Sequence, residues 1–202
     1  MAGRDPEATK ARLLAAALRE FSAKGIAGAR VDAIVERAAT NKRMLYHYFG
    51  SKEGLFRQIL RSRLVKGAAA LGDVDAPRSH ELSRLQDHYL ANPDYVRLLM
   101  WEALEMDPGR PVEEEAGRRE LYGRLIAGIE ADQAAGVIPA DLDASQLLLS
   151  QMALAMFPVA FPQLTRLVTG ADVADAGFVE RRRRFLGALG ARLGSGAAAP
   201  RR

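Results

Sequence analysis

The sequence predicts an all-α protein of about nine helices. Apolar residues recur at spacings of three and four along nearly the whole chain, which is the helical period. No stretch shows the strict alternation that is typical of a strand, and glycine, proline and asparagine divide the chain into segments of helix length. Hydrophobic content of 49% and charged content of 27% over 202 residues are ordinary for a globular protein of one or two domains.

The first helix is expected between Pro6 and Gly25. Leu14, Leu18 and Phe21 share one helical face, and Ala17 completes the apolar pattern. Proline is well suited to the first turn of a helix, and glycine to the position just after its last turn. This helix therefore has its own start and stop signals.

Two short helices follow, separated by a three-residue break. The apolar period of residues 31–38 lasts only two turns. Asn41 is a good N-cap for residues 42–49, whose inward side chains would be Leu45 and Phe49. The pair is a candidate helix-turn-helix unit, in which the second helix enters the major groove of DNA.

Six further helical segments are predicted. They are expected at residues 52–69, 79–91, 93–106, 112–135, 143–170 and 175–193. Ser51 and Asp143 can cap two of them, whereas Pro158 and Pro162 should kink or interrupt the segment that contains them. Residues 72–78 have the composition of a linker.

Positive charge is concentrated near the amino end. Residues 1–66 carry 14 Lys/Arg and 6 Asp/Glu, a net charge of +8, and residues 67–202 carry 15 and 19, a net charge of −4. This distribution is expected when one part of a protein meets a polyanion. The alternative is a solvated surface that is merely asymmetric.

Composition also excludes several classes of site. The chain has no cysteine, so it can form neither disulfides nor cysteine-based zinc sites. The three histidines are scattered without an acidic partner at ligand spacing, and we expect no metal and no cofactor. The start of the chain lacks the apolar run of a signal peptide, and no apolar run reaches the length of a membrane span. A cytoplasmic protein without membrane contact is expected.

The third predicted helix carries side chains that can contact DNA. Lys42 and Arg43 can meet phosphates or guanine edges, and Met44 offers an apolar contact to a thymine methyl group. Tyr46 and His47 can donate hydrogen bonds to phosphates. The alternatives are a helix-turn-helix inside a protein that binds no DNA, and cations that are simply solvated.

Residues that flank this helix complete the candidate DNA-contact set. Arg30 precedes the second helix, and Lys52 begins the fourth, where backbone N–H groups favour a phosphate. Thr40 and Asn41, in the break between the two short helices, are included.

Residues 8–60 resemble the DNA-binding domain of the TetR family of bacterial transcriptional regulators. The resemblance rests on the first helix with its "AKG" ending, on "VDAI", and above all on the block "LYHYFGSKEGL" at residues 45–55. It implies DNA contacts at Arg30, Lys42, Arg43, Met44, Tyr46, His47 and Lys52.

Two departures from the family pattern matter. The family turn usually reads Ala-Gly-Val-Ser, whereas this chain reads Ala38-Ala39-Thr40-Asn41. Loss of the glycine implies a turn that needs no positive φ, or one with modest strain. Arg43-Met44 stands where the family often has Gly-Thr, so the base preference cannot be borrowed from relatives.

The resemblance also implies a domain organisation. We expect a DNA-binding domain at residues 1–52, a helical ligand-binding and dimerisation domain at 53–194, and a disordered tail at 195–202. The helices at 143–157 and 175–193 would pair with their copies in a four-helix bundle. A homodimer is also expected because one short helix reads few base pairs, and a dimer places two of them about 34–36 Å apart.

A ligand pocket is expected between helices of the second domain. Candidate lining residues are Tyr89, Tyr95, Met100, Trp101, Met106, Met152, Met156, Phe157 and Phe161. Their character favours an apolar or aromatic ligand. The alternative for each is ordinary packing in the core or at the dimer interface. The "ERRRRF" run at residues 180–185 favours a solvated face with interface salt bridges over a second DNA site.

Together these patterns predict a dimeric, sequence-specific DNA-binding regulator, a repressor that a small ligand releases from its operator. The chain has no Gly-rich phosphate loop, no Gly-x-Ser-x-Gly and no His-Glu-x-x-His, so an enzyme is not expected. One alternative is a helical enzyme or interaction bundle. Another is a DNA-binding protein controlled without a small molecule.

Overall fold

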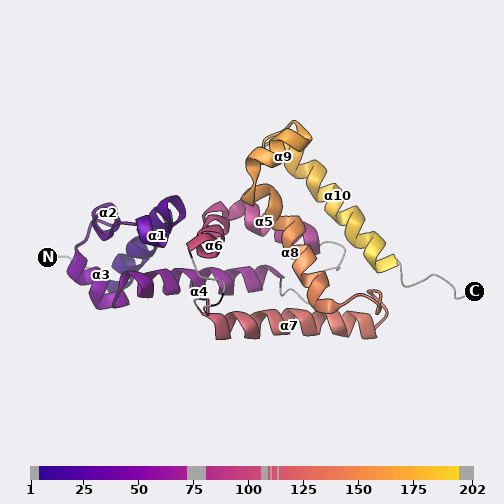
Figure 1. Ribbon diagram of the computed structural model, residues 1–202, viewed down its shortest axis with the longest axis horizontal. Helices are drawn as coiled ribbons and strands as arrows, with labels where there is room; N and C mark the ends of the chain where they lie inside the picture. Colours follow the sequence, from indigo (N-terminus) through magenta and orange to yellow (C-terminus); the bar gives the residue numbers. More distant parts are fainter. Residues whose placement is uncertain (1–4, 72–80, 106–108, 110, 113, 196–202) are drawn as a thin grey trace, which may run out of the picture. The chain divides into compact units, whose positions relative to one another are not determined.

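The computed structural model describes residues 5–71, 81–105, 109, 111–112 and 114–195. All regular structure in these ranges is helical (Figure 1). The helices are α1 (Pro6–Gly28), α2 (Val31–Arg37), α3 (Lys42–Phe49), α4 (Lys52–Leu71), α5 (Glu81–Ala91), α6 (Pro93–Glu105), α7 (Glu115–Ala134), α8 (Ala144–Ala160), α9 (Pro162–Thr169) and α10 (Ala176–Ser195). The all-α prediction is confirmed.

The described residues contain ten helices rather than about nine, because the predicted segment 143–170 is two helices. The axes of α8 and α9 differ by 90° across Phe161. Pro162 begins α9, and a proline restricts the residue before it to non-helical backbone angles. Pro158 lies inside α8 and does not end it. The predicted interruption is therefore confirmed at Pro162.

The chain forms two compact units. The first contains Met1–Val65 and Asp94–Glu115, and the second contains Lys66–Pro93 and Ala116–Arg202. The division by contacts differs from a boundary at residue 52, because most of α4 and nearly all of α6 belong to the first unit. The predicted linker at 72–78, Met106 and nearly all of the tail at 195–202 lie outside the described residues.

The core of the first unit joins α1 to α4. Phe21 and Phe56 are fully buried and meet edge to face, with ring centroids 5.4 Å apart. Leu13, Ile34 and Leu45 are also fully buried, so α1, α2 and α3 each contribute to the same unit. Apolar burial of this kind is the main term that holds a small helical unit together.

The end of α1 packs against α6, also within the first unit. Arg97 Nε and Trp101 Nε1 both donate to the carbonyl oxygen of Ser22, each at 3.1 Å. Gly25 has a φ of +70°, which agrees with its predicted role as a helix-ending glycine, and one more turn follows it. A Cβ atom at Gly25 would overlap the Glu105 carboxylate and the Trp101 ring. Glycine is thus required at this position both by the positive φ and by the lack of room for a Cβ atom.

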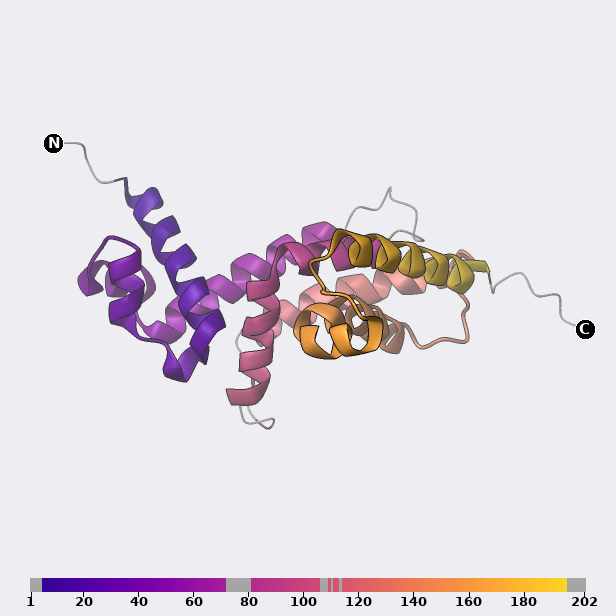
Figure 2. The same ribbon diagram turned by 90° about the horizontal axis from the view of Figure 1, so that it is seen from above.

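The second unit is organised around α5, which packs against both α8 and α10. Ser83 Oγ donates to the carbonyl oxygen of Arg183 at 3.2 Å, and the Arg183 guanidinium pairs with Asp87 at 2.8 Å. A separate apolar cluster that includes Ile129 and Leu148 joins α7 to α8. Figures 1 and 2 show α9 at the turn between α8 and α10.

A search of the described helices finds none that is by itself long and apolar enough to cross a membrane. The bent pair α8 and α9 passes the same criteria of length and composition only when its two helices are taken together.

Candidate nucleic-acid interface and effector region

The turn between α2 and α3 is fixed from behind by α1. Arg12 Nε donates to the carbonyl oxygen of Ala38 at 3.1 Å, so a cation satisfies the carboxyl end of α2. The N–H of Thr40 donates to the carbonyl oxygen of Val35 at 3.0 Å. Asn41 caps α3 as predicted, because its side chain accepts from the N–H of Met44 at 3.0 Å. The turn is thus held by Arg12 from α1, by the backbone bond from Thr40 and by the Asn41 cap.

Ala39 shows how the turn accommodates the missing glycine. Its φ is +49°, in the left-handed region that glycine tolerates much better than alanine. Of the two outcomes that the sequence left open, the structure has the strained turn. The left-handed conformation costs an alanine about 1–2 kcal/mol.

Helix α3 has one side buried and one side exposed. Leu45 is fully buried, while Met44, Tyr48 and Phe49 are partly buried. The exposed side chains are Lys42, Arg43, Tyr46 and His47. At about 100° per residue these four occupy one continuous arc of the helix surface. Met44, which the sequence also predicts as a DNA contact, lies at the edge of this arc.

The cations beside the arc differ in their contacts. Lys42 Nζ pairs with Asp32 on α2 at 2.8 Å, and this hydrogen bond raises the pKa of Lys42 above its usual range. Both members of the pair are exposed, so a phosphate can replace Asp32 at low cost. Arg30 and Arg43 are exposed as well.

A buried carboxylate positions the start of α2. The Glu20 side chain is 3% exposed and accepts from Lys24 at 2.8 Å and from the backbone N–H of Arg30 at 3.3 Å. The Lys24 hydrogen bond holds the pKa of Glu20 below its usual range. Glu20 thereby fixes the backbone from which the Arg30 side chain extends.

The junction of α3 and α4 is equally well defined. The N–H of Gly54 donates to Ser51 Oγ at 2.9 Å, which confirms Ser51 as the cap of α4. A Cβ atom at Gly54 would lie closer to the Phe49 carbonyl oxygen than two nonbonded atoms can approach. Lys52 is partly buried, and its Nζ lies 3.4 Å from the carbonyl oxygen of Ala29. Lys52 Nζ therefore lies at the start of α2, next to the backbone of Arg30.

The predicted ligand residues do not come together in one unit. Tyr95, Met100 and Trp101 belong to α6 in the first unit, where the Trp101 indole is bonded to Ser22. The others belong to the second unit; they are Tyr89, Met152, Met156, Phe157 and Phe161. Tyr89 and Tyr95 are buried, whereas Phe157 and Phe161 are exposed.

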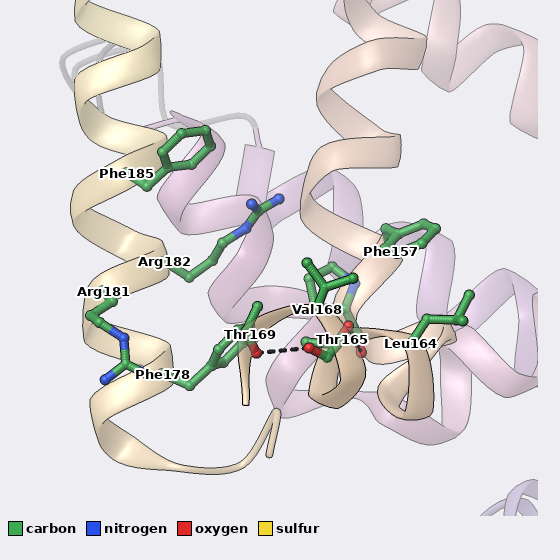
Figure 3. A pocket seen from close by; sticks show the side chains of 10 residues that line it. Phe157, Leu164, Thr165, Val168, Thr169, Phe178, Arg181, Arg182 and Phe185 are labelled. Atoms are coloured by element: carbon green, nitrogen blue, oxygen red, sulfur yellow. Dashed lines mark hydrogen bonds between the residues drawn. The ribbon is translucent and has the colours of Figure 1, made fainter. Parts of the chain in front are cut away.

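A pocket of about 340 Å³ lies among α8, α9 and α10 in the second unit (Figure 3). Its walls include Phe157, Leu164, Val168, Phe178 and Phe185. Of the predicted ligand residues, only Phe157 lines this pocket. The prediction missed the rest because their spacing on α9 and α10 is that of ordinary apolar helix faces.

Arg182 gives this pocket its one partly buried charge. Its Nη2 donates to the carbonyl oxygen of Leu154 at 2.7 Å, and its guanidinium lies 5.3 Å from the centroid of the Phe185 ring. Burial lowers the pKa of Arg182. The "ERRRRF" run therefore has one arginine turned toward α8, and Arg183 is paired with Asp87.

The described residues contain no group of three or more His, Asp or Glu side chains that could hold a metal ion. They do contain a helix-turn-helix whose second helix, α3, is held in place by hydrogen bonds and exposes cations. The same chain continues into a second unit that is also α-helical. That combination defines a DNA-binding transcriptional regulator.

The comparisons identify the family. Residues 13–59 match the family described as "Bacterial regulatory proteins, tetR family", and residues 82–192 match "Tetracyclin repressor-like, C-terminal domain". The chain belongs to the TetR family of transcriptional regulators, and it is a regulator rather than an enzyme.

Named relatives agree with this assignment. The chain is 39% identical to the HTH-type transcriptional repressor SCO4008 of Streptomyces coelicolor, over 88% of this chain and 91% of the relative. It is 30% identical to the HTH-type transcriptional regulator RutR of Escherichia coli K12, over 85% and 83%. The crystal structure of the regulator SCO4942 from Streptomyces coelicolor is similar with a TM-score of 0.75 at 28% identity, over 91% and 97%.

Proposed function

We propose that the protein is a homodimeric repressor of the cytoplasm that binds an operator in double-stranded DNA and is released by a small apolar or aromatic ligand. The observation that carries the DNA contact is the exposed arc of α3 over the buried Leu45. A relative 39% identical to the chain is named a transcriptional repressor, which supports repression over activation.

The residues divide into two roles. Arg43, with Lys42 and Met44 beside it, is proposed to contact base edges in the major groove. The phosphate contacts are proposed for Arg30, Thr40, Asn41, Tyr46, His47 and Lys52. Because the Asn41 side chain already caps α3, the amide group has its nitrogen left for a phosphate.

The dimer is proposed to form through α8 and α10. Helix α8 has no charged residue, and Leu149 and Phe157 on it are 60% and 48% exposed. Phe185 on α10 is 52% exposed. Exposed apolar side chains grouped in this way mark interaction surfaces. The copy that covers them would complete a four-helix bundle and also close the pocket among α8, α9 and α10.

Release is proposed to follow from ligand binding in the second unit. Helix α4 is continuous in sequence across both units, which divide after Val65, so it can transmit the change. A shift from almost fully bound to almost fully released requires the ligand to favour the released state by about 5.5 kcal/mol.

The DNA contact is tested by comparing Lys52→Ala and Arg43→Ala with the parent protein. Lys52→Ala should weaken binding to all operators alike and lower the slope of log affinity against log salt by about one unit. Arg43→Ala should relax the base preference in a selection from randomised sites. Arg124→Ala is the matched control, because this exposed arginine lies on α7 in the second unit, where it pairs with Glu120.

The outcomes separate the possible roles. Salt slopes that are equal for the Lys52 variant and the parent would contradict the phosphate contact, and an unchanged base preference would contradict the Arg43 contact. Operators are obtained from genome-wide binding, and compounds suggested by neighbouring genes are then tested for release. Regulation without a small molecule is favoured if none of them releases the DNA.

A further inference from the structure

Gln86 is a buried polar side chain on α5 of the second unit. It is 2% exposed. Neither its Nε2 nor its Oε1 has a partner among the described residues. Buried amides are nearly always paired, because an unpaired donor or acceptor loses its hydrogen bonds to water without replacement. Gln86 therefore calls for a specific explanation.

The position of Gln86 belongs to the apolar face of α5. Leu82, Leu85, Gln86 and Tyr89 have the spacing i, i+3, i+4, i+7, and all four are buried. The neighbouring polar residues of α5 are paired: Ser83 and Asp87 both bond to Arg183 on α10. A leucine or methionine would satisfy packing at Gln86, so packing does not explain the amide.

An aromatic side chain follows Gln86 on the same face of α5. Tyr89, one turn further along α5, is buried, and this burial raises the pKa of Tyr89 to about 12, so its hydroxyl stays neutral. Tyr122 on α7 is close enough to Tyr89 to add to that shift. Tyr122 and Met152 pack against the apolar cluster of α7 and α8. A ligand that reached Gln86 would meet the ring of Tyr89, and an aromatic ring favours a planar partner.

We propose that Gln86 recognises the effector, and that the effector is a neutral, planar molecule with adjacent N–H and C=O groups, such as an aromatic lactam. Only a group that both donates and accepts satisfies the two ends of the amide at once. A carboxylate would leave the amide oxygen unpaired, and an ammonium group would leave the amide nitrogen unpaired. The inference rests on the proposed release by a small ligand and adds its chemistry.

The first test uses the free protein. Gln86→Met keeps the approximate volume and removes both unpaired atoms, so its melting temperature should rise above that of the parent. A lower melting temperature would mean that the amide is satisfied in the free protein, for example by a buried water, and would overturn the inference. Gln58→Met, a partly buried glutamine of α4 in the first unit, is the matched control.

The second test measures ligand binding by calorimetry. The probes are 2-pyridone, 2-quinolinone and phenanthridinone, each paired with its N-methyl derivative, which lacks the N–H donor. The parent should bind at least one lactam about tenfold more tightly than its N-methyl derivative, and Gln86→Met should lose this preference. If none of the three is preferred, or if the variant keeps the preference, the inference is wrong.

Operator binding by the same proteins separates this inference from the proposed function. Without ligand, Gln86→Met should bind DNA as the parent does. A parent that binds no DNA would contradict the proposed repressor and leave lactam binding at Gln86 intact. DNA binding by both proteins, without lactam preference in the parent, would contradict only the role of Gln86.

Discussion

The two units differ in the kind of side chain that they expose to solvent. In the first unit, the large apolar side chains that are exposed among the described residues are Tyr46 and Leu104. In the second unit they are Val137, Leu142, Leu149, Phe157, Phe161, Leu164, Leu167, Val168 and Phe185. The first unit has an exposed cationic arc on α3 instead.

This difference indicates different kinds of partner. Helix α3 is held in place by hydrogen bonds and exposes cations. The phosphates of a polyanion attract these cations at long range. A surface with Val168 at 84% exposure gains from removal of apolar area from water. Each unit should therefore depend on the interaction that its surface indicates.

The largest effect is expected from a charge on the outer face of α8. Leu149→Glu places a carboxylate in the proposed dimer interface, and twofold symmetry places it there twice. An unpaired buried charge costs about 3–5 kcal/mol, so the dimer dissociation constant should rise by more than about 100-fold. Analytical ultracentrifugation measures this constant. Val137→Glu, at an exposed site in the loop after α7, should leave it unchanged; equal effects of both variants would argue against the α8 interface.

The next effect tests how tightly the first unit is built. Gly54→Ala forces a methyl group against the Phe49 carbonyl oxygen and should lower the free energy of unfolding by about 1–3 kcal/mol. Gly123→Ala is the control, because a Cβ at this glycine of α7 meets nothing within 4 Å apart from its own stretch of helix. It should raise the free energy of unfolding by about 0.5–1 kcal/mol. Urea unfolding measures both, and a neutral result at Gly54 would contradict the close approach.

The third prediction is a pH dependence within the first unit. Glu20→Gln removes the carboxylate that accepts from Lys24 and Arg30, which should cost about 1–3 kcal/mol at pH 7. The pKa of Glu20 is lower in the folded state than in the unfolded state. The carboxylate therefore stabilises the folded state at pH values above the unfolded pKa, and this stabilisation is lost as pH falls through the folded pKa. The difference between parent and variant should therefore shrink below about pH 4.

Unfolding curves from pH 7 to pH 3 would show this trend. Glu130→Gln, an exposed residue of α7, is the control and should show little difference at any pH. A Glu20 variant whose deficit stays constant down to pH 3 would show that the charge of Glu20 is not the source of its contribution.

The smallest effect is expected in the turn of the first unit. Ala39→Gly removes the left-handed strain of about 1–2 kcal/mol but increases the entropy of the unfolded chain by about 0.4–1 kcal/mol. The net gain should lie between about 0 and 1.6 kcal/mol, which differential scanning calorimetry can resolve as a small rise in melting temperature. Ala127→Gly, in α7, should instead lower it. A loss at Ala39 as large as at Ala127 would contradict the strained turn.

The recognition helix was predictable because its signals are local. The Asn41 cap, the buried Leu45 and the exposed cations all lie within nine residues, and one short helix satisfies them together. The break at Pro162 was predictable for the same reason, since a proline restricts its own neighbours.

The lining of the pocket in the second unit was not predictable in this way, because it depends on which helices meet. Trp101 and Tyr89 have similar apolar character, yet the structure assigns them to different units. Gln86 could have been noticed, since it is a polar residue at an apolar position of the α5 pattern. Its lack of partners depends on neighbouring helices, which the spacing of residues within α5 does not reveal.

The bond between Trp101 and Ser22 gives the molecule a natural optical probe. The chain has a single tryptophan, and its indole N–H donates a hydrogen bond to the carbonyl oxygen of Ser22 on α1. The indole ring lies close to Gly25. Indole emission depends on hydrogen bonding and on exposure to water. The tryptophan fluorescence of the unlabelled protein should therefore report changes in the packing of α6 against α1. It can be followed in real time while operator or ligand is titrated.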